Sequence, residues 1–168
     1  MFIIVQLLGL IALIALVLSF QKNNKITLLK YQIISSFLYA VQYLLLNAYS
    51  GCFMNIACAL RNIVFSNYEK KVPKKYLILT IITMILLSAL SYKESISLLP
   101  CIACIIYSIS LSQPNLTITR ITHIISCTLY IIYNKKVLAI TGLICTIVEL
   151  SSSIIAILKY DLPKLKKN

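Results

Sequence analysis

Apolar residues fall into seven long runs that are separated by short polar breaks. Each run has roughly 16–22 residues, the helix length that a hydrocarbon layer of about 30 Å requires. Backbone groups in lipid must be satisfied internally, and β-barrel strands would be shorter and would alternate, so each run is expected to be a helix. The predicted spans are residues 2–20, 28–46, 49–65, 75–91, 95–111, 117–133 and 137–158.

The breaks between the runs are too short for an extramembrane domain. The sequence therefore predicts an all-α, polytopic membrane protein with one transmembrane domain over residues 1–168. The first run begins apolar at once and lacks a small-x-small cleavage site after it, so we expect an uncleaved span rather than a signal peptide.

The overall composition supports the same class of protein. About 60% of the residues are hydrophobic and 12% are charged, against about 25% charged in soluble domains. A soluble domain of this size could not hide so much apolar surface. The sparse charge also excludes a chain that is disordered because of its charge.

Basic residues gather in alternate breaks, which predicts the orientation. With seven spans, 13 of the 16 Lys and Arg residues lie on one side; without span 75–91 the division falls to about 11 against 5. The positive-inside rule then places the N-terminus outside and the C-terminus in the cytoplasm. The net charge of +12 suits anionic lipid headgroups, and no segment could form a basic domain for nucleic acid.

The two halves of the chain match at a shift of 91 residues without a gap. Sixteen of the 64 positions over residues 2–65 are identical, where shared composition predicts about 6. The alternative is coincidence between helices rich in Ile and Leu. Matched pairs that composition does not explain are Asn24 with Asn115, Tyr39 with Tyr130, and Gly51 with Gly142.

This match predicts a 3+1+3 arrangement of parallel repeats. Repeat one covers residues 2–65, a linker helix covers 75–91, repeat two covers 95–158, and a short basic tail covers 159–168. One intervening helix returns the second unit to the orientation of the first, as in SWEET-type transporters. We expect two triple-helix bundles around an axis normal to the membrane, with a polar seam between them.

Several segments resemble the YgjV-type family of small bacterial inner-membrane proteins. They are Ser19-Phe20-Gln21, Gln32, Leu44 to Gly51, Arg61-Asn62, and the run from Leu98-Leu99-Pro100 to Tyr160-Asp161. The resemblance implies a distant similarity to the SWEET/PQ-loop and nicotinamide-riboside transporters, which share the 3+1+3 plan. The paired Pro-Gln motif of that wider group is absent, because Pro100 has no Gln after it and its repeat mate is Gly9.

Glu149 is the only acid within any predicted span, near the middle of the last one. An ionisable group at this depth costs about 2.5–3.5 kcal/mol on insertion scales unless it has a partner or water. One interpretation is a protonatable or substrate-binding carboxylate in the seam. The other is a neutral Glu149 hydrogen-bonded to Ser152 or Ser153.

Arg61 lies in the cytoplasmic third of the third predicted span and is followed by Asn62. Its guanidinium could hold an anionic or carbonyl group of a substrate with two donors. Two alternatives remain at this stage: the side chain snorkels to the cytoplasmic headgroups, or it pairs with Glu149 across the seam.

Further polar side chains within the spans complete a predicted substrate-binding set. Tyr39 and Tyr130 are repeat mates in mid-span, and Asn55 lies one turn from Cys58 on the Arg61 side. The predicted lining residues are Asn55, Arg61, Asn62, Glu149, Tyr39 and Tyr130.

His123 is the only histidine, and its repeat mate is Gln32. It is interpreted either as half of a pseudo-symmetric site or as a histidine bonded to a carbonyl near the cytoplasmic interface. One His and one Glu do not complete a ligand set, so no metal site and no cofactor are expected.

Gly9 and Pro100 interrupt corresponding places in the first helices of the two repeats. Together they favour either a hinge, or close helix packing at Gly9 with Pro100 in a first helical turn. Cys101 and Cys104 form a C-x-x-C, the only feature that favours a membrane thiol–disulfide oxidoreductase. No enzymatic activity is expected.

The favoured function is a transporter-like facilitator of a small polar metabolite, with the bilayer as partner and a homo-oligomer as a further expected association. A non-transporting scaffold or regulatory protein is the first alternative, and the redox enzyme is the second. A cavity at the seam would favour transport, whereas a tightly packed seam would favour the scaffold.

Overall fold

The computed structural model describes residues 2–45, 49–90, 92, 95–136 and 140–165. These residues form helices and no strands. The helices are α1 (Phe2–Phe20), α2 (Lys25–Leu45), α3 (Tyr49–Ser66), α4 (Lys74–Leu90), α5 (Leu98–Leu111), α6 (Leu116–Lys136) and α7 (Ile140–Ala156). Shorter elements are the 3-10 turn η1 (Ser95–Ser97), the π-helical turn η2 (Ile157–Asp161) and α8 (Leu162–Leu165).

Each predicted apolar run corresponds to one of the seven long helices, with differences of a few residues at the ends. The second helix begins earlier than predicted because Asn24 caps it: its side-chain oxygen accepts a hydrogen bond from the backbone N–H of Thr27 at 3.1 Å. The described residues therefore confirm an all-α fold.

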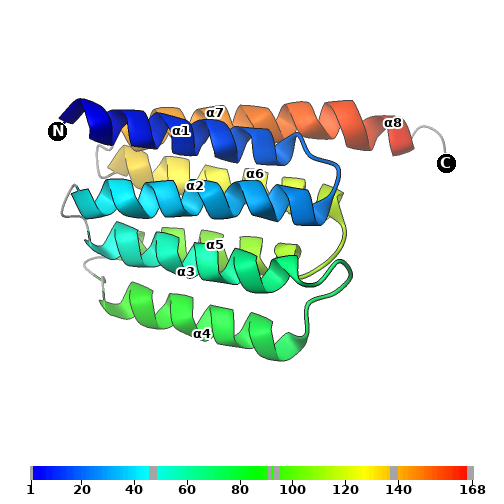
Figure 1. The fold of residues 1–168 in the computed structure, drawn as a ribbon, viewed down its shortest axis with the longest axis horizontal. Coiled ribbons are helices and arrows are strands. Elements are labelled where there is room, and N and C mark those ends of the chain that lie inside the picture. Colours follow the sequence, from blue (N-terminus) through cyan, green and yellow to red (C-terminus); the bar gives the residue numbers. More distant parts are fainter. Residues whose placement is uncertain (1, 46–48, 91, 93–94, 137–139, 166–168) are drawn as a thin grey trace.

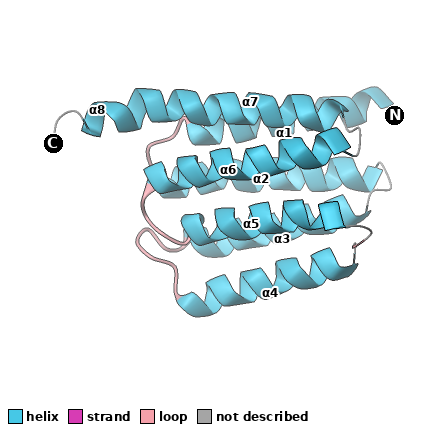
Figure 2. Ribbon diagram, turned by 180° about the vertical axis from the view of Figure 1, so that it is seen from behind, coloured by secondary structure: helices cyan, strands magenta, loops and turns pink. Residues whose placement is uncertain are grey.

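The helices are arranged in two layers (Figure 1, Figure 2). One layer contains α1, α2, α3 and α4 in that order, and the other contains α7, α6 and α5. Helix α1 packs against α7, and α4 contacts both α3 and α5. The first three helices thus face the last three, and the residues between these two layers become the candidate site.

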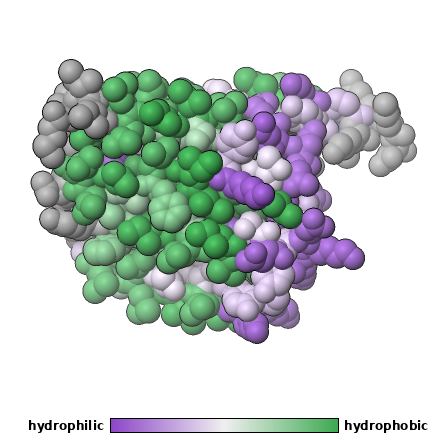
Figure 3. Space-filling view, viewed as in Figure 1, coloured by the Kyte–Doolittle hydropathy of each residue, from purple (hydrophilic) through white to green (hydrophobic). Residues whose placement is uncertain are grey.

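The face seen in Figure 3 is largely apolar, whereas polar side chains gather at one end of it. Leu90, Leu79 and Leu86 on α4 are 85%, 62% and 60% exposed. The polar end is where the chain passes from α1 to α2, from α3 to α4 and from α5 to α6, and the C-terminus lies there too. Such an apolar surface is typical of contact with lipid rather than water.

Two helices among the described residues are long and apolar enough to cross a bilayer by themselves, Leu116–Lys136 and Leu143–Asp161. Shorter apolar helices cover Leu7–Phe20, Cys52–Ser66 and Leu98–Leu111. Seven membrane crossings therefore stay a prediction, although all seven helices are present.

Several local features recur 91 residues apart. Helices α2 and α6 both have 21 residues and begin at positions 25 and 116. The hydroxyl of Ser35 donates to the carbonyl of Ala12 at 2.8 Å, and the hydroxyl of Ser126 donates to that of Ala103 at 3.0 Å. Each bond ties the first helix of a predicted unit to its second helix.

The starts of α2 and α6, and the ends of α1 and α5, also match at the same offset of 91 residues. Asn115 accepts a hydrogen bond from the backbone N–H of Ile118 at 3.2 Å, as Asn24 does from Thr27. Ser19 and Ser110 both donate to the backbone carbonyl three residues earlier, at 2.6 and 2.7 Å.

Gly9 lies where the side chain of Gln42 on α2 crosses α1. A Cβ atom at Gly9 would collide with the Gln42 amide group, so this glycine permits close packing. Pro100 is the third residue of α5, in the first turn, where proline removes no intrahelical hydrogen bond. Of the two alternatives, packing at Gly9 is therefore the one that the structure favours.

A buried ion pair lies at the polar end, and its arginine also bonds to the other layer. Arg120 on α6 is 0% exposed, and its Nη1 lies 2.9 Å from Oδ1 of Asp161, which is 3% exposed. The other guanidinium nitrogens donate to the carbonyls of Phe20 at 3.3 Å and Lys22 at 2.8 Å. Nη2 also donates to the Asn23 side chain at 3.1 Å. The turn after α1 is thus fixed to α6 and to the π-helical turn η2.

We expect Asp161→Asn to lower the free energy of unfolding by about 3–5 kcal/mol, because it leaves the buried Arg120 charge without its counter-charge. Unfolding of the purified protein in detergent, followed by circular dichroism, measures the change. Glu69→Gln is the matched control, since Glu69 is exposed. Equal stability of the two variants would contradict the structural role of the ion pair.

Candidate functional site

A layer of polar side chains lies in the interior between α1–α3 and α5–α7. All except the partly buried Glu149 are less than 9% exposed. We call this set the polar layer; its members are Gln32, Arg61, Asn62, Tyr107, Ser108, His123, Glu149 and Ser153.

Arg61 is held inside the protein by neighbours from α3 and α5. Its Nε donates to the Asn62 side-chain oxygen at 3.0 Å, and its Nη1 donates to the Ser108 hydroxyl at 3.0 Å. The guanidinium carbon lies 5.6 Å from the centroid of the Tyr107 ring, within reach of a cation–π interaction. Because Arg61 is 5% exposed, the snorkelling alternative is wrong.

Gln32 joins α2 to α5 in the same region. Its side-chain amide donates a hydrogen bond to the Tyr107 hydroxyl. Two polar atoms here are buried and find no hydrogen-bond partner among the described residues: the Gln32 side-chain oxygen and the Asn62 side-chain nitrogen. Each such atom costs about 1–3 kcal/mol when it is left unsatisfied.

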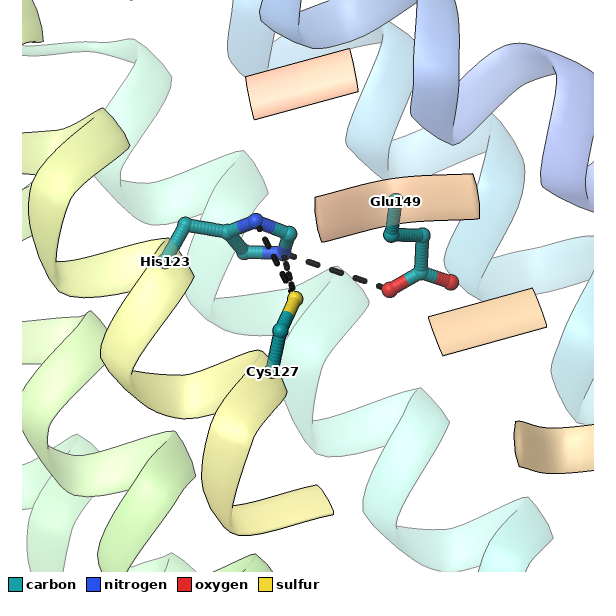
Figure 4. Close-up of side chains that lie close together, drawn as sticks. All are labelled: His123, Cys127 and Glu149. Atoms are coloured by element: carbon teal, nitrogen blue, oxygen red, sulfur yellow. Dashed lines mark hydrogen bonds and ion pairs between the residues drawn. The ribbon is translucent and has the colours of Figure 1, made fainter. Parts of the chain in front are cut away.

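His123 on α6 is fixed by contacts with Ser153, Phe20 and Tyr107, and it also lies beside Cys127 and Glu149 (Figure 4). Its Nδ1 lies 2.9 Å from the Ser153 hydroxyl on α7, and its ring lies 3.9 Å from the Phe20 ring, centroid to centroid. The Tyr107 ring approaches it edge-on at 5.2 Å. The expected bond to a carbonyl is therefore wrong, because a hydroxyl takes that place.

Glu149 on α7 approaches His123 rather than Arg61. Its Oε2 lies 4.0 Å from Nε2 of His123. The alternative in which Arg61 pairs with Glu149 is wrong, because Arg61 contacts Asn62, Ser108 and the Tyr107 ring among the described residues. The alternative in which Glu149 bonds to Ser152 or Ser153 is not supported either. Ser153 contacts His123, and the Ser152 hydroxyl donates to the carbonyl of Val17 at 2.9 Å.

Cys127 completes a cluster that the sequence analysis did not identify. It lies one turn after His123 on α6, with its sulfur 3.5 Å from Nδ1 and 3.8 Å from Nε2. The ligand atoms of His123, Cys127 and Glu149 all lie within 4.8 Å of one another. The i, i+4 spacing of His123 and Cys127 was a usable signal, because residues four apart share a helix face.

The remaining predicted lining residues lie elsewhere on α2, α3 and α6. Tyr39 and Tyr130 are partly buried and come seven residues after Gln32 and His123, which is about 10 Å further along their helices. The Tyr130 hydroxyl lies 3.2 Å from the sulfur of Cys104. Asn55 is partly buried on α3.

The C-x-x-C pair does not form a facing dithiol. The Cys101 sulfur lies 4.0 Å from the backbone oxygen of Met84 on α4. Cys104 instead contacts the Tyr130 hydroxyl on α6 at 3.2 Å and lies beside Cys58 on α3. Among the described contacts, the two thiols of the C-x-x-C therefore reach different helices rather than each other.

Two cavities of the structure lie away from the polar layer. A cavity of about 210 Å³ lies at the polar end between the turn before α2 and the start of α6, with Asn24, Lys25 and Pro114 in its wall. An apolar cavity of about 430 Å³ lies between α4 and α5, next to Ser88 and Tyr92. In this conformation the polar layer is closed by packed side chains.

The comparison with protein families assigns the chain. A family model described as bacterial inner membrane protein, Imp-YgjV, matches residues 3–164. The chain belongs to the Imp-YgjV family. As a member of this family it is a bacterial inner membrane protein, as the resemblance implied. Neither a curated protein nor a solved structure matches it.

We expect Tyr107→Phe to lower the free energy of unfolding by about 1–3 kcal/mol, because the buried Gln32 amide loses its acceptor. Unfolding of this Imp-YgjV protein in detergent measures the change. Tyr92→Phe serves as the control, since Tyr92 is 51% exposed. If Tyr107→Phe is as stable as the wild type, the polar layer does not contribute through this bond.

Proposed function

We propose that this protein is a transporter-like facilitator of a small polar solute, in which the units α1–α3 and α5–α7 rock against each other around the polar layer. The observation that carries the proposal is that two buried polar atoms, the Gln32 oxygen and the Asn62 nitrogen, have no hydrogen-bond partner within the described part of the chain. They offer an acceptor and a donor beside the charged Arg61.

A solute that has both donors and acceptors would satisfy these atoms. Nε and Nη1 of Arg61 donate hydrogen bonds to Asn62 and Ser108. The remaining N–H groups of the guanidinium are therefore suited to an anionic or carbonyl group of the solute. We therefore keep Asn55, Arg61, Asn62, Glu149, Tyr39 and Tyr130 as lining residues and add Gln32.

The recurrence at 91 residues supports two parallel repeats. The equal helices α2 and α6, the matched serine bonds and the matched Asn caps all have the same offset. In the two layers, α1 lies opposite α7 and α3 lies opposite α5, which is the arrangement that a two-fold axis normal to the membrane generates. Transport folds built from such repeats hold their substrate between the two units.

The contacts of Arg120 provide a closure at the polar end. Arg120 and Asp161 belong to the second unit, whereas Phe20 and Lys22 belong to the first. Rocking that opens this end would break the bonds to Phe20 and Lys22 and keep the ion pair with Asp161. The ion pair would thereby hold the guanidinium ready for the return of the first unit.

Seven crossings, with the N-terminus outside and the C-terminus in the cytoplasm, form part of the proposal. The polar end carries the C-terminus and the connections that are rich in Lys, and the positive-inside rule places such connections in the cytoplasm. Fusion of a fluorescent protein that matures only in the cytoplasm to residue 168 should give fluorescent cells. Alkaline phosphatase, which is active only in the periplasm, should be inactive when it is fused to the same residue. The reverse pair of results would contradict the proposed topology.

A non-transporting scaffold remains a second candidate because of one observation. The polar layer is closed by packing, with Arg61 and Asn62 5% and 1% exposed. A transporter shows such packing only in its occluded state, whereas a scaffold keeps it permanently. Transport activity itself is therefore what separates the two functions.

Metabolite profiling tests the transport function without an assumed substrate. Cells that lack the gene are compared with cells that express the wild type, Arg61→Gln or Ser151→Ala at equal levels in the membrane. We expect the level of at least one polar metabolite to depend on the wild-type protein and to return to the level of the deletion strain in Arg61→Gln, because the solute loses its charged donor.

Ser151→Ala is the matched control, because Ser151 is exposed on α7 and bonds only to the carbonyl of Ile147 in its own helix among the described contacts. It should behave like the wild type. A profile that the protein does not alter would favour the scaffold. If the metabolite profile of Arg61→Gln equals that of the wild type, Arg61 does not bind the solute.

A further inference from the structure

We propose that His123, Cys127 and Glu149 form a binding site for a divalent transition-metal ion of the zinc type. Their ligand atoms lie within 4.8 Å of one another. An imidazole, a thiolate and a carboxylate together are the donors that Zn²⁺ and its first-row neighbours prefer, whereas Mg²⁺ and Ca²⁺ prefer oxygen atoms alone.

The helices bring these three donors together by simple geometry. His123 and Cys127 share one face of α6 because they lie four residues apart, and Glu149 reaches them from α7 (Figure 4). From Nε2 of His123 the Cys127 sulfur lies at 3.8 Å and the Glu149 oxygen at 4.0 Å. Tetrahedral Zn²⁺ with ordinary bond lengths spaces such atoms about 3.4–3.6 Å apart. The two pairs from Nε2 would therefore contract by about half an ångström. The sulfur and the carboxylate oxygen, which lie within 4.8 Å of each other, would contract by up to about 1.3 Å.

The surroundings of His123 orient it for this role. Its Nδ1 is engaged by the Ser153 hydroxyl at 2.9 Å, so Nε2 is the nitrogen directed at Glu149. The Phe20 ring packs against the imidazole at 3.9 Å. Metal-binding histidines usually engage their second nitrogen in such a hydrogen bond, which sets the tautomer and the plane of the ring.

The charges of the site suit a buried divalent ion. Cys127 is 2% exposed, and a doubly charged ion in such surroundings requires compensating charge. A thiolate and a carboxylate supply two negative charges, and binding would release the proton of the thiol to the solvent. Three protein ligands leave a fourth coordination position for water or for a donor atom of a solute. Catalytic zinc sites keep such an open position, whereas structural zinc sites do not.

Metal binding is separable from the proposed transport function, although Glu149 belongs to both sets. It needs no solute and no movement of the two units. The assay below measures the ion alone, whereas the metabolite profile depends on Arg61, which is not among the ligands. Failure of one proposal therefore leaves the other standing.

Cobalt titration of the full-length protein tests the site. The purified protein in detergent is freed of metal with a chelator, reduced, and titrated with Co²⁺ as a spectroscopic probe for Zn²⁺. We expect one Co²⁺ per chain, a near-ultraviolet charge-transfer band from thiolate to cobalt, visible bands typical of tetrahedral Co²⁺, and loss of both upon addition of Zn²⁺. Zn²⁺ should also raise the temperature of unfolding, because a ligand that binds only the folded state stabilises it.

Variants assign the bands to residues. Cys127→Ser should abolish the charge-transfer band, whereas Cys145→Ser, a cysteine on α7 outside the cluster, should retain it. Ser153→Ala should weaken Co²⁺ binding about 10–100-fold, as loss of a supporting hydrogen bond does at other metal sites. Cys127→His replaces sulfur by nitrogen and should bind Co²⁺ without the band, which covers the case in which the serine variant does not fold.

Two results would overturn the proposal. One is a wild-type protein that gives no thiolate charge-transfer band at saturating Co²⁺. The other is a band that persists in folded Cys127→Ser, since it would then arise from other thiols such as the pair Cys58 and Cys104.

Discussion

Polar groups that are buried among apolar helices must find their partners inside the protein, and this constraint shapes the molecule. Arg120 is its clearest case, because its guanidinium is fully buried and bonds to Asp161 and to the backbone carbonyls of Phe20, the last residue of α1, and of Lys22. An arginine cannot shed its charge to escape such surroundings. The turn after α1, the start of α6 and the end of α7 must therefore meet around it, and that meeting fixes how the two layers pack.

The helices could be predicted from the sequence because the apolar runs are long and the breaks are polar. The ends were less accessible: the second helix starts at Lys25 because Asn24 caps it, a local bond that hydropathy does not report. The importance of Asp161 was also missed. It lies after the last apolar run, and only the π-helical turn Ile157–Asp161 carries it back to Arg120.

Single residues of the candidate site could be predicted, but their partners could not. Arg61, Asn62 and Glu149 stand out because polar groups are rare in apolar runs. Which side chains they contact depends on how the two layers pack against each other. In the structure Glu149 lies beside His123, and Arg61 donates a hydrogen bond to Ser108. Cys127 and Tyr107 carry no such signal, because thiols and tyrosines are common in apolar helices and gain meaning only from their neighbours.

In the proposed register the two units carry different chemistry at matched places. His123, Glu149 and Ser153 of the second unit correspond to Gln32, Cys58 and Asn62 of the first. The second unit thus has the proposed metal ligands His123 and Glu149, and the supporting Ser153, at positions where the first unit has neutral groups. The buried cation Arg61 of the first unit corresponds to Ser152 of the second. A site shared between such units would hold a solute asymmetrically, with its anionic or carbonyl part toward Arg61 and a donor atom toward the cluster around His123. The Tyr107 ring separates these two poles, since it lies 5.6 Å from the Arg61 guanidinium and 5.2 Å from the His123 ring.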